Sequence, residues 1–300
     1  MTTTTLPTAG LLSLYSHIAP HYEAEVAPAF APLAGDLAQW SARCFSAYLD
    51  GTLDDPFALD VSKSPNLTIS ALDLGCGTGL LARQLAIYCQ QVIGVDLSVP
   101  MLTAAPADPR LHYLAADLHA LPFRSGALRL AVSSFGLNST TPSRVLRSIA
   151  RLLRPNGGML CFQEWGAVDD ASQLVDEIVQ QFTPTEFSYP DPALQEFFNT
   201  DRLWFDRLQD ADDYHEALKR AGFALAWVQE SAFVSVDLSI EQFIRYKLAW
   251  ASRGLVIEAL PDQRRAELLH DLTTQLTALT DDGITLRWQP LLFRVCAVLG

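Results

Sequence analysis

The chain is short of basic residues: its 300 residues include 21 lysines and arginines against 34 aspartates and glutamates, a formal net charge of −13. Binding to nucleic acid or to anionic lipid needs a positively charged face, so this balance argues against both partners. The first basic residue is Arg43, so the start has no positive stretch of the kind that opens a secretory signal. An apolar run of about 18 residues, long enough to span a bilayer, is also missing. These absences predict a cytoplasmic protein without stable membrane insertion.

Cysteine is also scarce, with five residues in the chain. So few, and an odd number, do not make a disulfide scaffold. No two of them form a Cys-x-x-Cys pair, and no histidine stands at a spacing typical of a zinc site. We therefore expect no metal centre and interpret the cysteines as small buried apolar residues. They are Cys44, Cys76, Cys89, Cys161 and Cys296.

Hydrophobic residues, in contrast, make up 49% of the chain, which predicts a globular protein of one or two domains. Between residues 67 and 166, short apolar runs alternate with helical patterns. The runs cover residues 68–74, 91–95, 111–115, 128–133 and 158–163, and the helical patterns cover 80–88, 100–105 and 143–153. Such alternation favours a parallel sheet with helices on both faces. The runs lack a period of two, which indicates strands buried on both sides.

Residues 1–66 form an N-terminal helical segment and a linker. The helical pattern between residues 11 and 49 is interrupted by Pro20, Pro28 and Pro32. Because proline disrupts a helix interior, we expect several short helices there.

Beyond the central segment, residues 167–215 read as a helical insertion rich in aromatic residues. Residues 216–300 complete the sheet, beginning with a strand over 223–236. A helical insertion follows at about 239–282 and reads as a pair of helices. The apolar run at 290–299 suits a central strand.

A glycine-rich turn follows the first predicted strand, in the sequence ALDLGCGTGL of residues 71–80. Gly75, Gly77 and Gly79 allow a sharp turn and let a ligand approach the backbone. The next helix offers free N–H groups to an anionic group, at the region where open α/β sheets bind ligands. Asp96 ends the second predicted strand, where a carboxylate is well placed to accept both hydroxyls of a ribose.

A further acidic residue, Asp117, follows the third predicted strand. Two nucleotide ligands fit this order of a glycine turn and acidic strand ends. Gly77, Gly79 and Ala82 satisfy the looser GxGxxA form of a dinucleotide site, which would indicate an NAD(P)-dependent oxidoreductase. Asp73, with glycines at alternate positions after it, fits the different pattern D-x-G-x-G-x-G.

This second pattern resembles the first motif of the class I S-adenosylmethionine-dependent methyltransferases, and the resemblance covers about 100 residues. Residues 94–98 resemble the second motif, 116–117 the third, 133–138 the fourth, and 153–158 the turn that follows it, with one asparagine inserted. Residues 11–24, with Tyr15, Ala19 and Tyr22, resemble the N-terminal lid of the type 11 and ubiquinone/menaquinone C-methyltransferase-like branch. One departure is Arg129, where the family often has aspartate.

The resemblance implies a Rossmann-like, doubly wound α/β fold: a seven-stranded, mostly parallel sheet with helices on both faces, a helical lid and insertions. It implies S-adenosylmethionine as methyl donor and S-adenosylhomocysteine as product. Asp73 and the three glycines would then hold the methionine end and Asp96 the ribose, while Leu97 packs on the adenine and Asp117 accepts from its amine. The full set, in which Ser133 or Ser134 contacts the amino group through the backbone, is Tyr15, Tyr22, Asp73, Gly75, Cys76, Gly77, Gly79, Asp96, Leu97, Asp117, Leu118, Ser133 and Ser134.

Methyl transfer from a sulfonium is an in-line displacement, and alignment of two reactants can supply roughly 7–11 kcal/mol of the barrier. A covalent nucleophile is therefore not required. For a hydroxyl or an acidic carbon, a general base would add about 10²–10⁴-fold. All six histidines are candidate bases: His17, His21, His112, His119, His215 and His270. The ones selected are His17 and His21, four residues apart in the expected lid, together with Glu164, just beyond the fifth predicted strand.

The acceptor is expected to be a small molecule, aromatic or apolar, bound between the lid and the insertion. Seven aromatic residues, Phe182, Phe187, Tyr189, Phe197, Phe198, Trp204 and Phe205, either line this pocket or pin the insertion onto the sheet. A non-catalytic protein that binds S-adenosylmethionine for regulation stays open as well, because the motifs concern the donor and not turnover. The sequence carries no signal for the oligomeric state.

Overall fold

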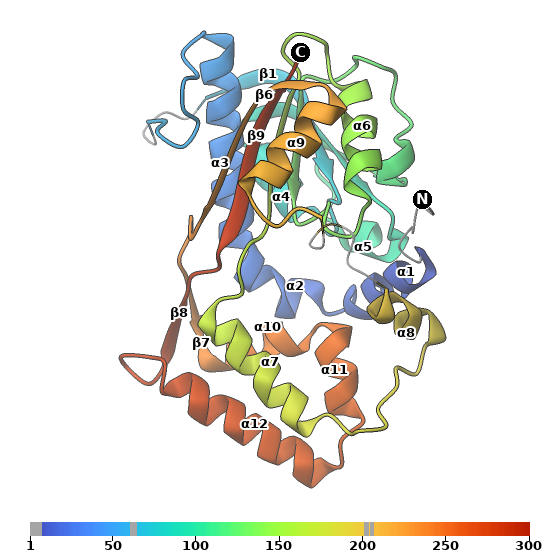
Figure 1. Ribbon diagram of the computed structural model, residues 1–300, viewed down its shortest axis with the longest axis vertical. Helices are drawn as coiled ribbons and strands as arrows, with labels where there is room; N and C mark the ends of the chain where they lie inside the picture. The colour runs from blue at the N-terminus through green and yellow to red at the C-terminus, as the bar shows by residue number, and fades with distance from the viewer. Residues whose placement is uncertain (1–7, 61–64, 201–203, 205–206) are drawn as a thin grey trace.

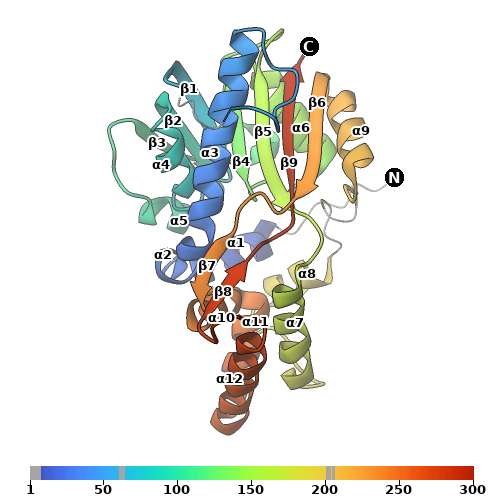
Figure 2. The same cartoon turned by 90° about the vertical axis from the view of Figure 1, so that its left-hand side faces the viewer.

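The computed structural model describes residues 8–60, 65–200, 204 and 207–300. Its centre is a seven-stranded sheet in the order β3-β2-β1-β4-β5-β9-β6, which fills the upper half of the molecule (Figures 1 and 2). The strands are β1 (Leu67–Leu74), β2 (Cys89–Asp96), β3 (Leu111–Ala115), β4 (Leu130–Ser134), β5 (Met159–Trp165), β6 (Phe223–Ser231) and β9 (Leu292–Leu299). The pairs from β3 to β5 are parallel, and β9 is antiparallel to both β5 and β6. The predicted fold class, a doubly wound and mostly parallel seven-stranded sheet, is confirmed.

Helices cover both faces of this sheet. The helices α3 (Ala27–Leu49) and α4 (Leu80–Leu85) pack on one face, and α6 (Pro142–Leu152) and α9 (Ala211–Ala221) pack on the other. Along β5, Met159 and Cys161 join the core under α3, whereas Leu160 and Phe162 join the core under α6 and α9. All four side chains are fully buried, which explains why the apolar runs show no period of two.

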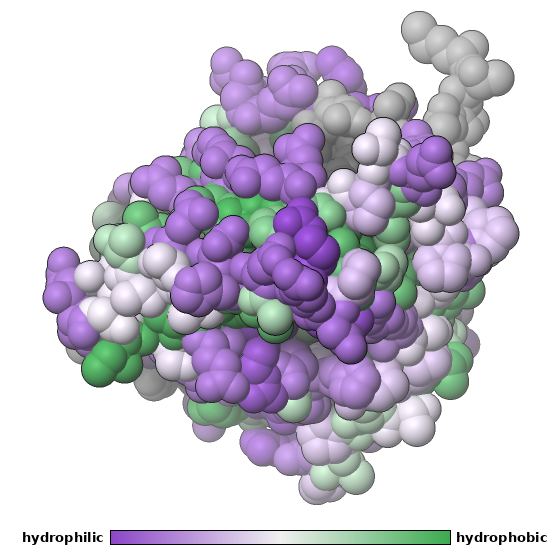
Figure 3. Space-filling model, turned by 90° about the horizontal axis from the view of Figure 1, so that it is seen from below, coloured by the Kyte–Doolittle hydropathy of each residue, from purple (hydrophilic) through white to green (hydrophobic). Residues whose placement is uncertain are grey.

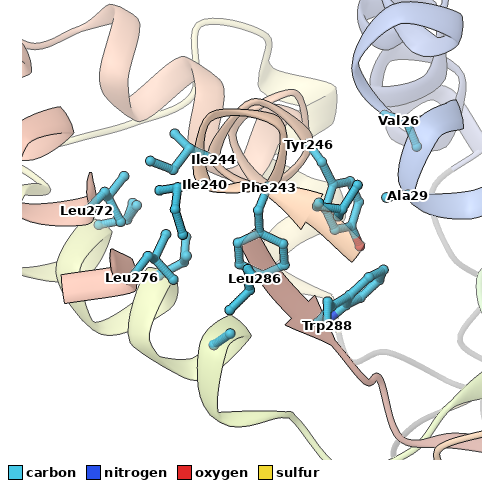
Figure 4. Packing of buried hydrophobic residues seen from close by; sticks show 14 of the residues in the cluster. Val26, Ala29, Ile240, Phe243, Ile244, Tyr246, Leu272, Leu276, Leu286 and Trp288 are labelled. Carbon is cyan, nitrogen blue, oxygen red and sulfur yellow. The ribbon is translucent and has the colours of Figure 1, made fainter. Parts of the chain in front are cut away.

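A second core lies beyond the carboxyl ends of the strands, in a part that we call the helical lobe (Figures 1 and 2). The lobe contains α7 (Asp170–Phe182), β7 (Val236–Ser239), α10 (Ile240–Leu248), α11 (Ala251–Glu258), α12 (Asp262–Thr277) and β8 (Thr285–Trp288). Its interior is apolar: Phe243 and Ile244 of α10 pack with Leu272 of α12 and Trp288 of β8 (Figure 4). Seen from below, the outer face of the molecule is mostly hydrophilic (Figure 3).

Three short helices lie between the sheet and the helical lobe: α1 (Thr8–Ile18), α2 (Tyr22–Glu25) and α8 (Pro192–Asn199). Helix α5 (Val99–Ala104) follows β2 and contacts α1. Among the described residues, no helix combines the length and the apolar character needed to cross a membrane.

The expected series of short helices in the N-terminal segment is partly wrong, because α3 is one helix of 23 residues. Pro28 lies in its first turn, where the backbone N–H would have no helical partner in any case. Pro32 lies inside the helix, with its side chain in solvent. Burial of the inner face of α3 against the sheet outweighs the loss of that one hydrogen bond.

The single strand expected over residues 223–236 is also wrong. Strand β6 ends at Ser231, which pairs with Leu292, the first residue of β9, so the chain beyond it has no partner in the main sheet. The chain then forms β7, which pairs with β8 in a separate two-stranded antiparallel sheet that the sequence did not reveal. The expected helical pair is three helices, α10 to α12.

Candidate functional site

A cavity of about 750 Å³ lies where the carboxyl ends of β1, β2 and β4 face α1 and the helical lobe. This volume falls in the range of roughly 300–1,000 Å³ that is usual for small-molecule sites. Two kinds of residue line it. The carboxylate half contains Asp73, Gly75, Gly77, Asp96 and Asp117, and the aromatic half contains Phe30, Phe135, Trp165, Tyr246 and Trp250.

The glycine turn follows β1, and its conformation requires glycine. Gly75, Gly77 and Gly79 all have positive φ values, of 70°, 52° and 81°. A Cβ on Gly75 would lie 2.5 Å from the Cα of Gly136, and a Cβ on Gly79 would lie 2.3 Å from the Tyr113 hydroxyl. The turn is therefore held tightly by neighbouring strands and loops, and α4 begins directly after it.

Asp96, at the end of β2, has a fixed carboxylate. The backbone N–H of Gly77 donates to Oδ2 at 2.8 Å, and the backbone N–H of Ser98 donates to Oδ1 at 2.8 Å. Burial raises the pKa of Asp96, and these two amides oppose the rise. Because each carboxylate oxygen can accept more than one hydrogen bond, the group can still accept from a ligand in the cavity.

Asp73, at the end of β1, is a second buried carboxylate in the same wall. Its Oδ2 atom has no hydrogen-bond partner. Burial and the nearby charge of Asp96 raise the pKa of Asp73 to about 8. Among the described residues, no cationic side chain forms an ion pair with either carboxylate. A ligand that carries positive charge would favour the ionised form of both groups.

Asp117 and His119 form a hydrogen-bonded unit at the next strand end. Asp117 Oδ1 accepts from the backbone N–H of His119 and pairs with His119 Nδ1, each at 2.8 Å. The backbone N–H of Thr141 donates to His119 Nε2 at 2.9 Å. Both ring nitrogens of His119 therefore have a hydrogen-bond partner. His119, one of the six histidines considered as candidate bases, lines the cavity.

The remaining predicted cofactor residues divide into two groups. Tyr15, Tyr22, Cys76, Leu97, Leu118 and Ser134 line the cavity. Ser133 does not line it, and its hydroxyl donates to the carbonyl oxygen of Leu74 at 2.7 Å, which ties β4 to the end of β1. Gly79 also lies outside the wall, as the N-cap of α4.

The structure does not bring the three predicted bases to the cavity. His17 and His21 are exposed, and α1 ends at Ile18, so they do not share a helix face. Glu164 is fully buried outside the cavity wall, and its Oε1 accepts from the backbone N–H of Leu137 at 3.0 Å. Burial raises the pKa of Glu164 to about 8. Its observed contact holds the loop after β4, which contributes Asn138 to the cavity wall.

The aromatic half is a connected cluster of rings. Phe135 and Trp165 stack with their centroids 4.2 Å apart. Phe30 contacts three rings of the cluster edge to face. Its ring centroid lies 5.1 Å from that of Phe135, 5.8 Å from that of Trp165 and 5.6 Å from that of Tyr246. These rings come from α3, the loop after β4, the end of β5 and α10. No local pattern in the sequence predicts this cluster, because its members are far apart in the chain.

The aromatic-rich insertion contributes less to the wall than its composition suggested. Phe197 and Phe198 line the cavity. Trp204 instead packs under the sheet with Phe162, and its indole N–H donates to the Tyr214 hydroxyl at 3.1 Å. Phe205, which the sequence analysis also grouped here, lies outside the described residues.

All five cysteines are buried. Cys44 of α3, Cys161 of β5 and Cys296 of β9 come together, with their sulfur atoms within 4.8 Å of one another. Cys161 and Cys296 face each other in register across β5 and β9. This grouping lies in the core between α3 and the sheet, and the sequence did not predict it.

Comparison with known proteins places residues 72–161 in a family described as a methyltransferase domain. An uncharacterized methyltransferase, C70.08c of Schizosaccharomyces pombe, is 26% identical over 205 residues, which are 63% of this chain and 72% of that protein. The malonyl-[acyl-carrier protein] O-methyltransferase of Salmonella typhimurium is 30% identical over 203 residues, 61% of this chain and 75% of that protein. The demethylmenaquinone methyltransferase of Lactococcus lactis is 28% identical over 179 residues, 54% of this chain and 68% of that protein.

Proposed function

The chain belongs to the class I S-adenosylmethionine-dependent methyltransferases, and we propose that it methylates a small-molecule acceptor bound in the same cavity as the donor. The observation that carries this proposal is that one cavity is lined both by carboxylates at the strand ends and by a connected cluster of aromatic rings. The family match, residues 72–161, contains Asp73, Asp96 and Asp117 but not Phe30, Tyr246 or Trp250. The shared segment therefore supplies the carboxylates of the donor side, and, apart from Phe135, the rings of the aromatic half come from the rest of the chain.

The carboxylate half suits S-adenosylmethionine, which supplies an activated methyl group on a positively charged sulfur. Asp73 and Asp96 have no cationic partner among the described side chains, so a cationic ligand would stabilise their ionised forms. Asp96, fixed by two backbone amides, is set to accept from the ribose hydroxyls. Oδ1 of Asp117 is already hydrogen-bonded to His119, so Oδ2 is available to accept a hydrogen bond from the adenine amine.

The residues around the aromatic half orient the acceptor and exclude water. A stacked pair such as Phe135 and Trp165 offers a flat apolar surface, which favours a planar or apolar molecule. Alignment of two reactants in one enclosed site can supply roughly 7–11 kcal/mol, so the reaction does not depend on a base in the wall. The one histidine among the described residues that line the cavity, His119, has both ring nitrogens occupied.

The alternative of an NAD(P)-dependent oxidoreductase rested on Gly77, Gly79, Ala82 and Asp96. Membership of the methyltransferase family favours the methyl donor over the nicotinamide cofactor for the same turn. A thermal-shift comparison of S-adenosylhomocysteine with NADH separates the two ligands. We expect stabilisation by S-adenosylhomocysteine alone.

The test of turnover is transfer of a labelled methyl group from S-adenosylmethionine to the low-molecular-mass fraction of a cell extract. We expect label to appear in organic products with the wild type and with the control Asp212→Ala, whose side chain is exposed on α9. Asp96→Ala should abolish transfer. If the wild type binds S-adenosylhomocysteine but transfers no label, the protein is a non-catalytic binder and the proposal of catalysis is wrong.

A further inference from the structure

Lys247 is a buried cation in the wall of the aromatic half. It lies on α10, lines the cavity, and has 7% of its surface exposed. Among the described residues, no side chain forms a hydrogen bond or an ion pair with its ammonium group. Burying an ammonium group without a partner costs free energy, so an unpaired ammonium in a cavity wall indicates a ligand that pairs with it.

Three aromatic rings lie close to the ammonium group. Lys247 Nζ lies 5.5 Å from the ring centre of Phe243, 5.3 Å from that of Tyr246 and 5.9 Å from that of Trp288. Phe243 and Tyr246 come from α10 and Trp288 from β8, and the three rings lie side by side in Figure 4. Cation–π contacts of this kind replace part of the lost hydration but leave the three N–H donors unsatisfied.

The carboxylates nearest to Lys247 already have partners. Asp176 of α7 binds the Arg253 guanidinium, with Nε at 2.6 Å from Oδ1. Asp169, the N-cap of α7, accepts from the backbone N–H and the hydroxyl of Ser172 and from Trp288 Nε1 at 3.0 Å. Burial first and the Arg253 charge second lower the pKa of Lys247 to about 8, although Asp169 and Asp176 oppose the shift. Neither carboxylate therefore serves as a dedicated ion-pair partner.

We propose that Lys247 binds an ionised oxygen of the acceptor, which makes the acceptor a flat or apolar acid with a carboxylate, or with a phenol- or enol-type hydroxyl. The inference rests on the proposed function, because it concerns the acceptor side of the same cavity. It makes Lys247 a specificity-determining residue. It also argues against cationic acceptors, because the Lys247 ammonium would repel a positive charge placed beside it.

The test is calorimetric titration of the protein saturated with S-adenosylhomocysteine, at pH 7.5, with four probes of one shape. The probes are 2-naphthoate, 2-naphthol, the neutral 2-naphthamide and the cationic 2-naphthylmethylammonium. We expect naphthoate or naphthol to bind at least tenfold more tightly than the amide, and the ammonium compound to bind most weakly. The stronger of the two acids identifies the oxygen type. Equal binding of acid and amide, or no binding of any probe to a protein that binds S-adenosylhomocysteine, would overturn the inference.

Variants then assign the preference to Lys247. We expect Lys247→Met to remove the tenfold preference for the acid and Lys247→Arg to retain part of it. The matched control is Lys219→Met, because Lys219 is exposed on α9 and lies outside the cavity wall. An unchanged acid preference in Lys247→Met would contradict the assignment.

Binding of S-adenosylhomocysteine itself keeps the two proposals apart. A variant that retains this affinity is folded, so a changed acid preference reports on the acceptor side alone. If Lys247→Met does not bind S-adenosylhomocysteine, the wild-type comparison of acid with amide still decides whether the acceptor is an acid. Failure of the wild type to bind S-adenosylhomocysteine counts against the proposed function, whereas the acid preference counts for or against Lys247.

Discussion

At the scale of single residues, the site is defined by ionisable groups that have no oppositely charged partner among the described residues. Asp73 is a buried and Asp96 a half-buried carboxyl group in one wall, and Lys247 is a buried amine in the aromatic half of the cavity. Low-dielectric surroundings make each of these charges costly when it is unpaired. The residues therefore indicate two ligands of opposite local charge, a cationic donor beside the carboxylates and an acidic acceptor beside the lysine.

The pKa of Asp73 predicts how the stability of the free protein depends on pH. Its pKa is raised from 3.8 to about 8 in the folded state, so between these values the folded protein holds a proton that the unfolded chain has lost. The free energy of unfolding should therefore fall as the pH rises toward 8. Between pH 6 and pH 8, Asp73→Asn should reduce this fall by about 2 kcal/mol. Urea unfolding of both proteins at the two pH values measures the difference, and equal slopes would contradict the assignment.

The glycine turn gives a second prediction, with a matched control in the same chain. Gly75 and Gly51 have nearly equal φ values, 70° and 67°, but a Cβ on Gly51 meets nothing within 4 Å whereas one on Gly75 meets Gly136. Gly51→Ala should cost about 1–2 kcal/mol from the backbone conformation alone. Gly75→Ala should cost about 1–3 kcal/mol more from the overlap. Denaturant unfolding tests this, and equal losses would show that the turn is looser than described.

Glu164 provides a test of whether a buried acid near the site acts as a base. Its observed hydrogen bond to Leu137 supports a positioning role, since the side chain does not line the cavity. Glu164→Gln keeps an acceptor for that N–H group and should lower kcat by less than about tenfold. A general base would cost about 10²–10⁴-fold. Steady-state methyl transfer by the variant decides between the two roles.

At the scale of the elements, α3 shows where tertiary packing overrides a local signal. Three prolines predicted breaks, and Pro20 does lie between α1 and α2. Helix α3 nevertheless continues through Pro32, because Leu33, Leu37 and other residues of its inner face are fully buried against the sheet and the lobe. A window of sequence does not contain the surface that provides this burial, so the length of α3 was not predictable from it.

The two prolines of α3 predict different effects on stability. Pro32 is exposed inside the helix, and Pro28 is exposed in the first turn. Pro32→Ala restores a backbone hydrogen bond, and we expect it to raise the free energy of unfolding by about 2 kcal/mol. Pro28→Ala should change it by less than about 0.5 kcal/mol, because no helical partner exists for that N–H group. Urea unfolding compares them, and a destabilising Pro32→Ala would contradict this account of α3.

At the scale of the whole molecule, the two halves of the cavity differ in how far the sequence predicted them. The carboxylate half is built from residues at the ends of consecutive strands, so a glycine turn and acidic strand ends such as Asp96 were enough to locate it. The aromatic half joins Phe30, Trp165 and Trp250, which are far apart in the chain. They come together because the helical lobe packs at the end of the sheet. Long-range contacts of this kind leave no periodic or short-range pattern, so composition pointed only to residues 182–205, of which Phe197 and Phe198 line the cavity.

The same reasoning explains the helical lobe and the predicted bases. Strands β7 and β8 are short, belong to no long apolar run, and pair with each other across the whole of α10 to α12. The predicted bases His17 and His21 were selected for their position in the expected lid, whereas their exposure depends on where α1 ends. Residue type and spacing identified the donor side, and the tertiary fold determines the acceptor side.

The central claim is that the carboxylate half binds S-adenosylmethionine, and calorimetric titration with S-adenosylhomocysteine tests it most directly. We predict saturable binding to one site per chain in the wild type and at least a tenfold loss of affinity in Asp96→Ala. This variant lacks the carboxylate that accepts from Gly77 and that we expect to accept from the ribose. Asp212→Ala should bind as the wild type does. Absence of heat and of any thermal shift with the wild type at millimolar ligand would contradict the claim.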